Sequence, residues 1–316
     1  MNLYINAIAH YIPEVVVPNS HFKKLNGLDD EWIYSRTGIK TRSKVTDGEN
    51  TNTMALNAVE KAVGKLPYDI SEVDLIVAAT YSPYDTVATP AHAIQSRYSI
   101  PNAKCVCVSS ACSSFINAME IVEGYMKMGK ASKALVVASE HNTKYANETD
   151  PQSGHLWGDG AVAVFISGER CQDADAEILS IYTRGLGHIG KAMEAVHLHP
   201  QDGGISMPEG KDVFINACNY MVEALQKAGE SCGKTIQDLN HIAPHQANLR
   251  IIRNIAKQHD IPEDRFMVTI EGWGNTGCPS CMITLSEHSN RIQKNDLVGL
   301  TVFGGGYSCG ALLLQY

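Results

Sequence analysis

The chain alternates short runs of apolar, often β-branched residues with longer segments whose apolar positions recur at helical spacing. In residues 51–65, for example, Met54, Ala55, Ala58 and Val59 fall on one face of a helix. Further helices are predicted at residues 112–128, 213–228, 249–259 and 279–293. The predicted strands are residues 75–79, 104–108, 134–138, 161–166, 242–243, 267–270 and 297–303. Because strands alternate with helices, we predict an α/β protein with parallel sheets covered on both faces.

The two halves of the chain show a weak internal similarity in this pattern. Each half has a predicted strand, a short segment with reactive residue types and then a helix, at residues 109–112 and 245–248. The most polar connection, residues 167–178, lies between them. We therefore predict an N-terminal half of residues 1–170 and a C-terminal half of residues 171–316, with one undivided domain as the alternative.

Composition and charge narrow the class of protein. A content of 44% hydrophobic and 19% charged residues in 316 residues is ordinary for a globular protein. The formal charge of -8 argues against a general nucleic-acid binder, which usually carries a basic excess. Residues 1–17 lack the features of a signal peptide, and no apolar run approaches the roughly 18 residues of a membrane helix. The odd number of cysteines, 9, predicts reduced thiols in a cytoplasmic protein rather than a disulfide framework.

Cys112 is the candidate nucleophile. Residues 104–120 predict a buried strand that turns through small residues into a helix, with Cys112 at or just before the helix start. There the unpaired N–H groups and the positive end of the helix dipole favour a thiolate over a thiol. Small neighbours such as Ser110 leave room for a thioester. The alternative is a small buried residue, as most free cysteines are; Cys105 and Cys107, inside the strand, are predicted to be core.

Two further polar residues come just after predicted strands. His245 follows a strand within residues 240–254, at the strand end where open α/β sheets place their ligands, although a lone histidine is more often structural. Asn275 lies in a tight turn after residues 267–270. Its amide can donate a hydrogen bond to a developing oxyanion at any pH, or it can serve αL geometry in a Gly-rich turn.

Other short motifs have competing interpretations. Residues 303–310 contain three successive glycines, which allow a substrate to approach the backbone but also fit a bulge between strands. The G-x-G-x-x-G pattern at 272–277 matches a dinucleotide fingerprint, but the acid about 20 residues further on, Asp296, opens a strand instead of ending one. The C-x-x-C at 278–281 lacks a thioredoxin-like context, and the order Cys, His, Asn lacks the local cysteine signature of papain-like proteases.

Taken in order, these segments resemble the β-ketoacyl-acyl carrier protein synthase III family of the thiolase superfamily, over nearly the whole chain. The matching segments are DEWIYSRTGIK (30–40), the serines around Cys112 (110–114), WGDGAVA (157–163), PHQAN (244–248), GNT (274–276) and FGGG (303–306). The ordered set is specific, because a Cys, a His and an Asn each fall in the setting that the family gives them. The resemblance implies a five-layered α-β-α-β-α thiolase fold of two similar halves, with Cys112, His245 and Asn275 as the catalytic residues.

The resemblance implies a condensation in two half-reactions. Cys112 takes an acyl group from an acyl-CoA or another thioester, while the backbone N–H groups of Cys112 and Gly305 hold the oxyanion. A malonyl thioester on an acyl carrier protein then loses carbon dioxide, and His245 and Asn275 stabilise the enolate oxygen. The enolate carbon attacks the acyl group and releases a β-ketoacyl thioester. The resemblance implies no metal, nucleotide or flavin cofactor.

The resemblance also implies binding residues and an assembly. Trp32 and Arg36 match family positions that stack on and bind the CoA adenine, which suits an indole face and a guanidinium. Arg250, Arg253 and Lys257 form a basic stripe on the helix after PHQAN, where an acidic carrier protein could dock; the alternative is a merely solvated surface. A homodimer is expected by analogy alone, and no nucleic-acid or membrane partner is expected.

Three stretches depart from the common family pattern. They are residues 276–279, residues 80–90, which lack a phenylalanine often found near the acyl pocket, and residues 185–204, a predicted long loop rich in Gly and His. Because they shape the acyl tunnel, the acyl group stays open between fatty-acid starters and the thioesters of a specialised polyketide- or pigment-type pathway. Two rival functions also stay open: a Cys-dependent acyltransferase or hydrolase, and a partner subunit of a condensing heterodimer.

Overall fold

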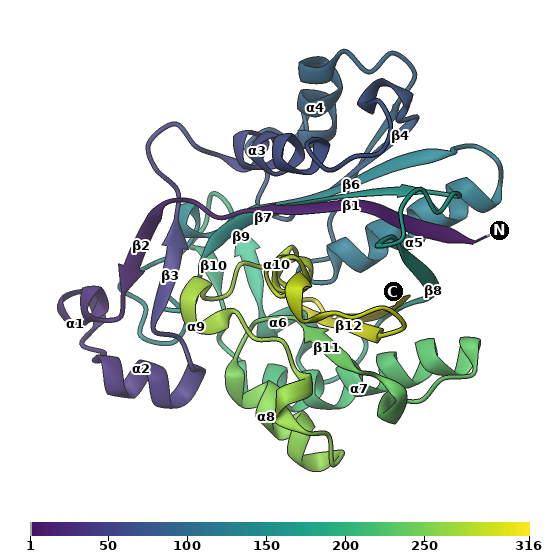
Figure 1. Ribbon diagram of the computed structural model, residues 1–316. Helices are drawn as coiled ribbons and strands as arrows, with labels where there is room; N and C mark the ends of the chain where they lie inside the picture. The colour runs from purple at the N-terminus through teal and green to yellow at the C-terminus, as the bar shows by residue number, and fades with distance from the viewer. Residues whose placement is uncertain (1) are drawn as a thin grey trace.

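Nine strands form one continuous mixed sheet in the computed structural model, which describes residues 2–316 (Figure 1). The strand order across the sheet is β11-β12-β13-β8-β1-β7-β6-β4-β5. Their bounds are β1 (Leu3–Tyr11), β4 (Leu75–Ala79), β5 (Lys104–Val108), β6 (Lys133–His141), β7 (Asp159–Ser167), β8 (Ala176–Gly185), β11 (His241–Pro244), β12 (Leu297–Gly304) and β13 (Ser308–Gln315). Two small sheets pair β2 (Val15–Pro18) with β3 (Thr41–Lys44), and β9 (His197–His199) with β10 (Gly204–Ser206).

The strand order repeats along the chain. The N-terminal group lies in the order β5-β4-β6-β7-β1 across the sheet. If its strands are numbered along the chain, this order is third, second, fourth, fifth and first. The C-terminal group, β11-β12-β13-β8, has the same order once the parallel bridge from Phe266 to Ile242 of β11 is counted as the missing third strand. The two groups join where β1 pairs briefly with β8, at Leu3 and Ile178 for example. The exact limits of the halves, residues 1–170 and 171–316, stay a prediction.

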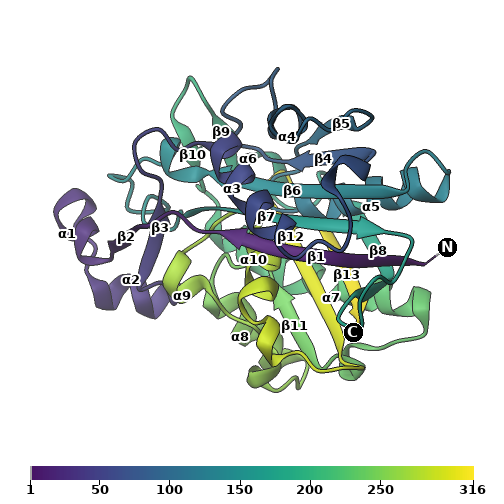
Figure 2. The same cartoon turned by 45° about the horizontal axis from the view of Figure 1, so that its top comes forward.

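Helices form three layers around the two groups of strands (Figures 1 and 2). One outer layer, α3 (Thr51–Val63) with α4 (Pro90–Tyr98), packs on the N-terminal strands, and α7 (Gly210–Cys232) with α8 (Leu249–Gln258) forms the other outer layer. The central layer, α5 (Ser114–Lys127) with α10 (Ser280–Glu287), contacts strands of both groups. The chain therefore has the predicted five-layered α-β-α-β-α thiolase fold. The remaining helices are α1 (Ser20–Asn26), α2 (Asp30–Thr37), α6 (Ala192–Ala195), α9 (Ile270–Trp273), η1 (Ile70–Glu72), η2 (Asn142–Lys144), η3 (Ile236–Asp238), η4 (Glu263–Arg265) and η5 (Ser289–Arg291).

The apolar pattern of each helix explains its layer. Phe115, Ile116 and Met119 of α5 are buried against strands of both groups, as a helix in the middle of a protein requires. The outer helix α8 instead buries one stripe, with Ile251 and Ile255 inside and its basic residues outside. Of the helices in residues 2–316, none is both long and apolar enough to cross a bilayer.

The sheet is mixed, so the prediction of parallel sheets was wrong in part. Only β4 with β5, β4 with β6 and β11 with β12 run parallel, and the other neighbours are antiparallel. The strands β1, β8 and β13, which sequence reasoning missed, make most of the antiparallel pairs. Small residues interrupt their apolar runs, as Gly310 does in β13, and this weakened the strand signal.

Three predicted elements need correction. The strand at 267–270 is wrong, because Phe266 makes a single bridge and Ile270 already begins α9. The helix at 279–293 stops at Glu287, where the chain turns into η5. The loop at 185–204 contains the short helix α6 and the strand β9.

Asp159, the first residue of β7, ties three segments together from a fully buried position. Its carboxylate accepts hydrogen bonds from the backbone N–H of Val45 at 3.0 Å and of Thr143 at 2.9 Å. Burial nevertheless raises the pKa of this carboxyl from 3.8 to about 6, because desolvation penalises the charged form.

The raised pKa of Asp159 makes its contribution to stability pH-dependent. The folded state binds the proton more tightly than the unfolded state, so this contribution is fully present below pH 3.8 and is lost as the pH rises through about 6. We expect the difference in unfolding free energy between the wild type and Asp159→Asn to shrink from about pH 4 to about pH 7, measured by urea titration. The control Asp69→Asn removes an exposed capping carboxylate whose pKa is lowered, so its difference stays nearly constant over this range. A difference for Asp159→Asn that widens with pH contradicts this account.

Candidate active site

Cys112 lies in the turn between β5 and α5, as predicted. Ala111 before it has a φ of 49°, a left-handed conformation that is strained for a residue with a side chain and turns the backbone sharply. The backbone N–H of Ser113 donates to the carbonyl of Ser110 at 3.2 Å, and that of Ser114 to the carbonyl of Ala111 at 3.1 Å. This turn holds Cys112 at the start of the central helix α5.

The expected thiolate is not the resting state of Cys112. Burial, together with the nearby negative charge of Glu140, raises the pKa of the thiol to about 12. Desolvation and the buried carboxylate thus outweigh the position at a helix start on which the prediction rested. Cys112 therefore rests as a neutral thiol and must give up its proton as it attacks.

His245 follows β11 directly and is held on two sides. Its backbone N–H donates to the carbonyl of Thr301 of β12 at 2.8 Å, and its Nδ1 lies 2.7 Å from the hydroxyl of Ser280. That hydroxyl accepts from the backbone N–H of Gln246 at 3.2 Å, so it can donate its own proton to Nδ1. The proton of the neutral imidazole then sits on Nε2. Burial lowers the pKa of His245 to about 4, which keeps the ring neutral at physiological pH.

Asn275 is fixed by its backbone and by its side-chain oxygen. Its N–H donates to the carbonyl of Leu156 at 2.8 Å, and its own carbonyl accepts from the N–H of Gly158 at 3.0 Å. The side-chain Oδ1 accepts from the N–H of Gly277 at 3.0 Å. Because this bond commits the oxygen, the amide nitrogen of the side chain is left to donate toward a ligand.

One tunnel brings Cys112, His245 and Asn275 together, so the three residues that the sequence singled out share a site. Its free volume is about 30 Å³, so the tunnel is narrow in this structure. The other lining residues are mostly apolar: Trp157, Val196, Met207, Val213, Ala217, Met221, Ala247, Ile251, Phe303, Gly304 and Gly305. The catalytic roles of the three polar residues stay predictions.

The glycine turn between β12 and β13 closes the tunnel beside Cys112. A Cβ atom on Gly304 would lie 2.9 Å from the carbonyl oxygen of Ser110 and 3.1 Å from the backbone nitrogen of Cys112. A Cβ atom on Gly305 would lie 2.9 Å from the Cβ of Val196. Within residues 2–316, the N–H groups of Cys112 and Gly305 donate to no protein acceptor. Both are placed where a pair of oxyanion donors is predicted.

Trp32 and Arg36, the predicted CoA-binding pair, lie together on α2. The Arg36 guanidinium sits 4.4 Å from the centre of the Trp32 ring, so it covers one indole face. The Asn248 side chain donates to the carbonyl of Arg36 at 3.0 Å and ties α2 to the start of α8, near the tunnel residue Ile251. Their role in binding CoA stays a prediction.

The predicted basic stripe runs along the outer face of α8. The Arg250 guanidinium lies 5.9 Å from the ring centre of Phe214 on α7. The Nε of Arg253 lies 3.8 Å from a carboxylate oxygen of Glu263, so part of its charge is balanced within the chain. Arg250 is thus the better placed of the two arginines to meet an acidic partner.

Sequence reasoning missed Glu140, a fully buried carboxylate at the end of β6. It accepts hydrogen bonds from the hydroxyl of Thr80 at 3.1 Å, the backbone N–H of Ser82 at 3.1 Å and the thiol of Cys278 at 2.9 Å. Burial raises its pKa to about 7. A signal was present, since an acidic residue that ends an apolar strand is unusual.

Sequence reasoning also missed Tyr81. Its hydroxyl donates to Asn142 Oδ1 at 2.7 Å and lies where a Cβ atom on Gly277 would have to sit, 2.4 Å away. Gly274 is required as well, because its Cβ would lie 2.9 Å from the carbonyl oxygen of Leu156. Internal packing thus accounts for Gly274 and Gly277, two of the three glycines of the G-x-G-x-x-G pattern, without a dinucleotide.

The cysteines differ from expectation in one respect. Cys278 and Cys281 of the C-x-x-C pattern are buried free thiols. Cys107, predicted to be core, is exposed, and Cys105 is half-buried, because β5 is the last strand of the sheet. Within residues 2–316 no group of three or more His, Cys, Asp or Glu side chains is arranged to hold a metal ion.

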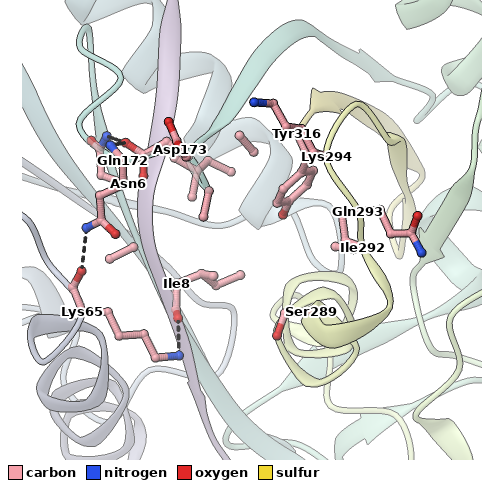
Figure 3. Close-up of a pocket in the computed structure, with 15 residues that line it drawn as sticks. Asn6, Ile8, Lys65, Gln172, Asp173, Ser289, Ile292, Gln293, Lys294 and Tyr316 are labelled. Atoms are coloured by element: carbon pink, nitrogen blue, oxygen red, sulfur yellow. Dashed lines mark hydrogen bonds between the residues drawn. The ribbon is translucent and has the colours of Figure 1, made fainter.

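A hollow of about 500 Å³ lies away from these residues. Figure 3 shows Asn6 and Ile8 of β1 on one side of it and Lys294 and Tyr316 on the other. Its lining includes none of the predicted catalytic residues. The narrow tunnel at Cys112 is therefore the candidate active site.

A thiol at the start of a central helix shares one pocket with an imidazole and an amide, between two repeated α/β groups. This arrangement is that of a thiolase-fold condensing enzyme. Residues 108–187 match the family model described as 3-oxoacyl-[acyl-carrier-protein (ACP)] synthase III, and residues 230–316 match the model of its C-terminal part. The chain is 32% identical over 326 residues to the β-ketoacyl-[acyl-carrier-protein] synthase III of Clostridium novyi, covering 100% of this chain and 99% of that protein. The chain belongs to the β-ketoacyl-[acyl-carrier-protein] synthase III family, and it is a condensing acyltransferase.

Two solved structures are similar over nearly their whole length. The 3-oxoacyl-[acyl-carrier-protein] synthase III of Aquifex aeolicus has a TM-score of 0.92 and 31% identity, covering 99% of this chain and 100% of that one. The priming β-ketosynthase of the R1128 polyketide pathway has a TM-score of 0.89 and 27% identity, covering 99% of this chain and 96% of that one. One of these two similar structures is thus named for a polyketide pathway.

Glu140 offers a direct test of the electrostatics at Cys112. In Glu140→Gln the buried negative charge is gone, and the amide nitrogen can point at the sulfur of Cys278 in place of Oε1. We expect the pKa of Cys112 to fall and its alkylation by iodoacetamide to become several-fold faster at about pH 8, as read by peptide mass. The matched control Glu148→Gln removes a carboxylate that pairs with Lys44, away from the tunnel. Equal or slower alkylation in Glu140→Gln contradicts this electrostatic account.

Proposed function

We propose that this enzyme transfers an acyl group from an acyl-CoA to Cys112 and condenses it with a malonyl thioester on an acyl carrier protein. In the first half-reaction, the Cys112 sulfur attacks the thioester carbon and its proton passes to the CoA thiolate as the C–S bond breaks. The N–H groups of Cys112 and Gly305 stabilise the oxyanion, since both face the tunnel without a protein acceptor. His245, with its proton on Nε2, stays neutral in this step.

In the second half-reaction, the malonyl carboxylate leaves as carbon dioxide and its electron pair forms an enolate. The Nε2–H of His245 and the side-chain amide of Asn275 donate hydrogen bonds to the enolate oxygen, which accumulates negative charge. The enolate carbon attacks the acyl carbon, and the C–S bond to Cys112 breaks. The products are a β-ketoacyl thioester, carbon dioxide and free Cys112, which regains a proton.

The observation that carries this proposal is the convergence of Cys112, His245 and Asn275 on one apolar tunnel. All three are uncharged at rest, because burial raises the pKa of the thiol and lowers that of the imidazole. In a mostly apolar pocket, hydrogen bonds act strongly on the charge that develops during reaction. The side chains thus supply the proton transfers and charge stabilisation, and we propose that no metal, nucleotide or flavin takes part.

We propose that the two substrates meet the enzyme beside α8. Trp32 and Arg36 lie on α2, which the Asn248 side chain ties to the start of α8. The indole and the guanidinium, which stack on each other, suit the adenine of CoA. Arg250 on the outer face of α8 suits the acidic surface of a carrier protein.

We further propose a homodimer joined through β5. This strand is the last of the nine, so one row of its backbone N–H and C=O groups has no neighbouring strand within residues 2–316. Its side chains are apolar yet exposed or half-buried, as in Val106, Cys107 and Val108. An edge of this kind pairs readily with a second copy. With nine free cysteines, we place the enzyme in the reducing cytoplasm.

The half-reactions can be separated by replacing one residue at a time. Incubated with acetyl-CoA, the wild type is expected to gain an acyl adduct on Cys112, seen by intact mass, and Cys112→Ala none. With malonyl-acyl carrier protein added, radiolabelled carbon dioxide and a β-ketoacyl product should appear. In Asn275→Ala we expect condensation to fall about 10²–10³-fold, the cost of one lost oxyanion donor, and loading to fall far less.

The same assay distinguishes the rival functions. A hydrolase or simple acyltransferase forms the adduct on Cys112 but releases no carbon dioxide from the malonyl thioester. A non-catalytic partner subunit forms no adduct with any acyl-CoA. Either outcome overturns the proposed condensation.

Docking of the carrier protein predicts a charge-specific effect at Arg250. In Arg250→Glu we expect KM for malonyl-acyl carrier protein to rise about tenfold or more, while acylation by acetyl-CoA changes much less. The matched control Arg170→Glu reverses a charge on the connection before β8 and should leave this KM unchanged. Equal losses with both substrates in Arg250→Glu rule out docking on α8.

A further inference from the structure

Trp157 lines the catalytic tunnel, and its side chain carries an unpaired hydrogen-bond donor. The residue is 3% exposed and lines the tunnel with Cys112. Its indole Nε1–H is buried and has no acceptor among residues 2–316. A buried donor without an acceptor is costly, and tryptophan N–H groups usually have a partner when buried. A phenylalanine would fill space here without burying an unpaired N–H group.

The backbone fixes the position of Trp157. The residues on either side of it are bonded to Asn275: the Leu156 carbonyl accepts from the Asn275 N–H at 2.8 Å, and the Gly158 N–H donates to the Asn275 carbonyl at 3.0 Å. The indole is therefore held in register with a candidate catalytic amide. A shift of the Trp157 backbone would displace Asn275 as well.

The other polar groups of the tunnel already have a partner or a proposed use. His245 Nδ1 faces Ser280, and Asn275 Oδ1 accepts from Gly277. The N–H groups of Cys112 and Gly305 are proposed to hold the thioester oxygen. Of these polar groups, the Trp157 N–H is left without a partner or a proposed use, on a residue of a lining that is otherwise mostly apolar. A single placed donor in an apolar site selects a ligand with a matching acceptor.

We propose that the acyl group loaded on Cys112 is short and carries an oxygen function, of the β-oxoacyl or β-hydroxyacyl class, that accepts the Trp157 N–H. This inference rests on the proposed function, because it specifies the acyl group of the same loading step. The narrow tunnel favours a short chain. The chemistry balances as ordinary thioester exchange: the Cys112 S–C bond forms, the CoA S–C bond breaks, and the thiol proton passes to CoA.

The malonyl carboxylate is the poorer match for this donor. It must leave as neutral carbon dioxide, and a hydrogen bond that stabilises its charge raises the barrier to that loss. An oxygen on the acyl group keeps its hydrogen bond through both half-reactions.

The test compares two thioesters of equal chain length, 3-oxobutanoyl-CoA and butanoyl-CoA. The rate of adduct formation on Cys112 is measured for each by intact mass, and the ratio of the two rates is taken within one protein. We expect the wild type to load the oxo compound at least about tenfold faster, which corresponds to about 1.4 kcal/mol. In Trp157→Phe the ring remains without the donor, and the ratio should fall toward one.

Trp273→Phe is the matched control, because the Trp273 indole N–H donates to Glu287 at 2.6 Å, outside the tunnel lining. Its ratio should equal that of the wild type. A wild-type ratio of one or less overturns the inference even if Trp157→Phe fails to fold. An unchanged ratio in Trp157→Phe, which is expected if the indole only holds a water, also overturns the inference. A change confined to KM for the malonyl thioester overturns it too. If acetyl-CoA also gives no adduct, the proposed function itself fails; if acetyl and butanoyl groups load without preference for the oxo compound, only this inference fails.

Discussion

The close backbone packing of Gly304 against the turn that carries Cys112 is the contact on which the site depends. Any side chain at Gly304 would meet the Ser110 carbonyl and the Cys112 nitrogen within 2.9 and 3.1 Å. Because Gly304 ends β12 and Cys112 precedes α5, this contact joins the two groups of strands at the thiol. The pairing of Asn275 with Leu156 and Gly158 joins them a second time. Both junctions are made by backbone, so the backbone positions of Cys112 and Asn275 do not depend on flexible side chains.

Burial gives the site its chemical character. The same apolar walls that raise the pKa of Cys112 lower that of His245, so the enzyme rests with a neutral thiol beside a neutral ring. A neutral imidazole with its proton on Nε2 can donate to an enolate oxygen, and Ser280 supports that tautomer. Glu140 adds a buried carboxyl behind the thiol, held by Thr80, Ser82 and Cys278. Among the described residues that line the tunnel with Cys112, none is a lysine or an arginine.

Local sequence patterns predicted the helices and strands whose limits are set by neighbouring residues in the chain. The strand at residues 104–108 and the start of the helix at residue 249 matched the structure, because each has a strong apolar period and an abrupt end. The family motifs placed Cys112, His245 and Asn275, which the fold brings to one tunnel. The antiparallel strands and the burial of Glu140 depend on partners far away in the chain, which no local pattern reports. The error about the thiolate has the same origin, since the position at a helix start is local, whereas the desolvation around Cys112 is set by the whole fold.

The most direct test of this account is a crystal structure of the enzyme after reaction with acetyl-CoA. The account predicts an acetyl group on the Cys112 sulfur, with its oxygen within hydrogen-bond distance of the backbone nitrogens of Cys112 and Gly305. His245 Nε2 and the amide nitrogen of Asn275 should face the acetyl carbon from the tunnel side. An acetyl group on another residue, or an acetyl oxygen turned away from both backbone nitrogens, would contradict it.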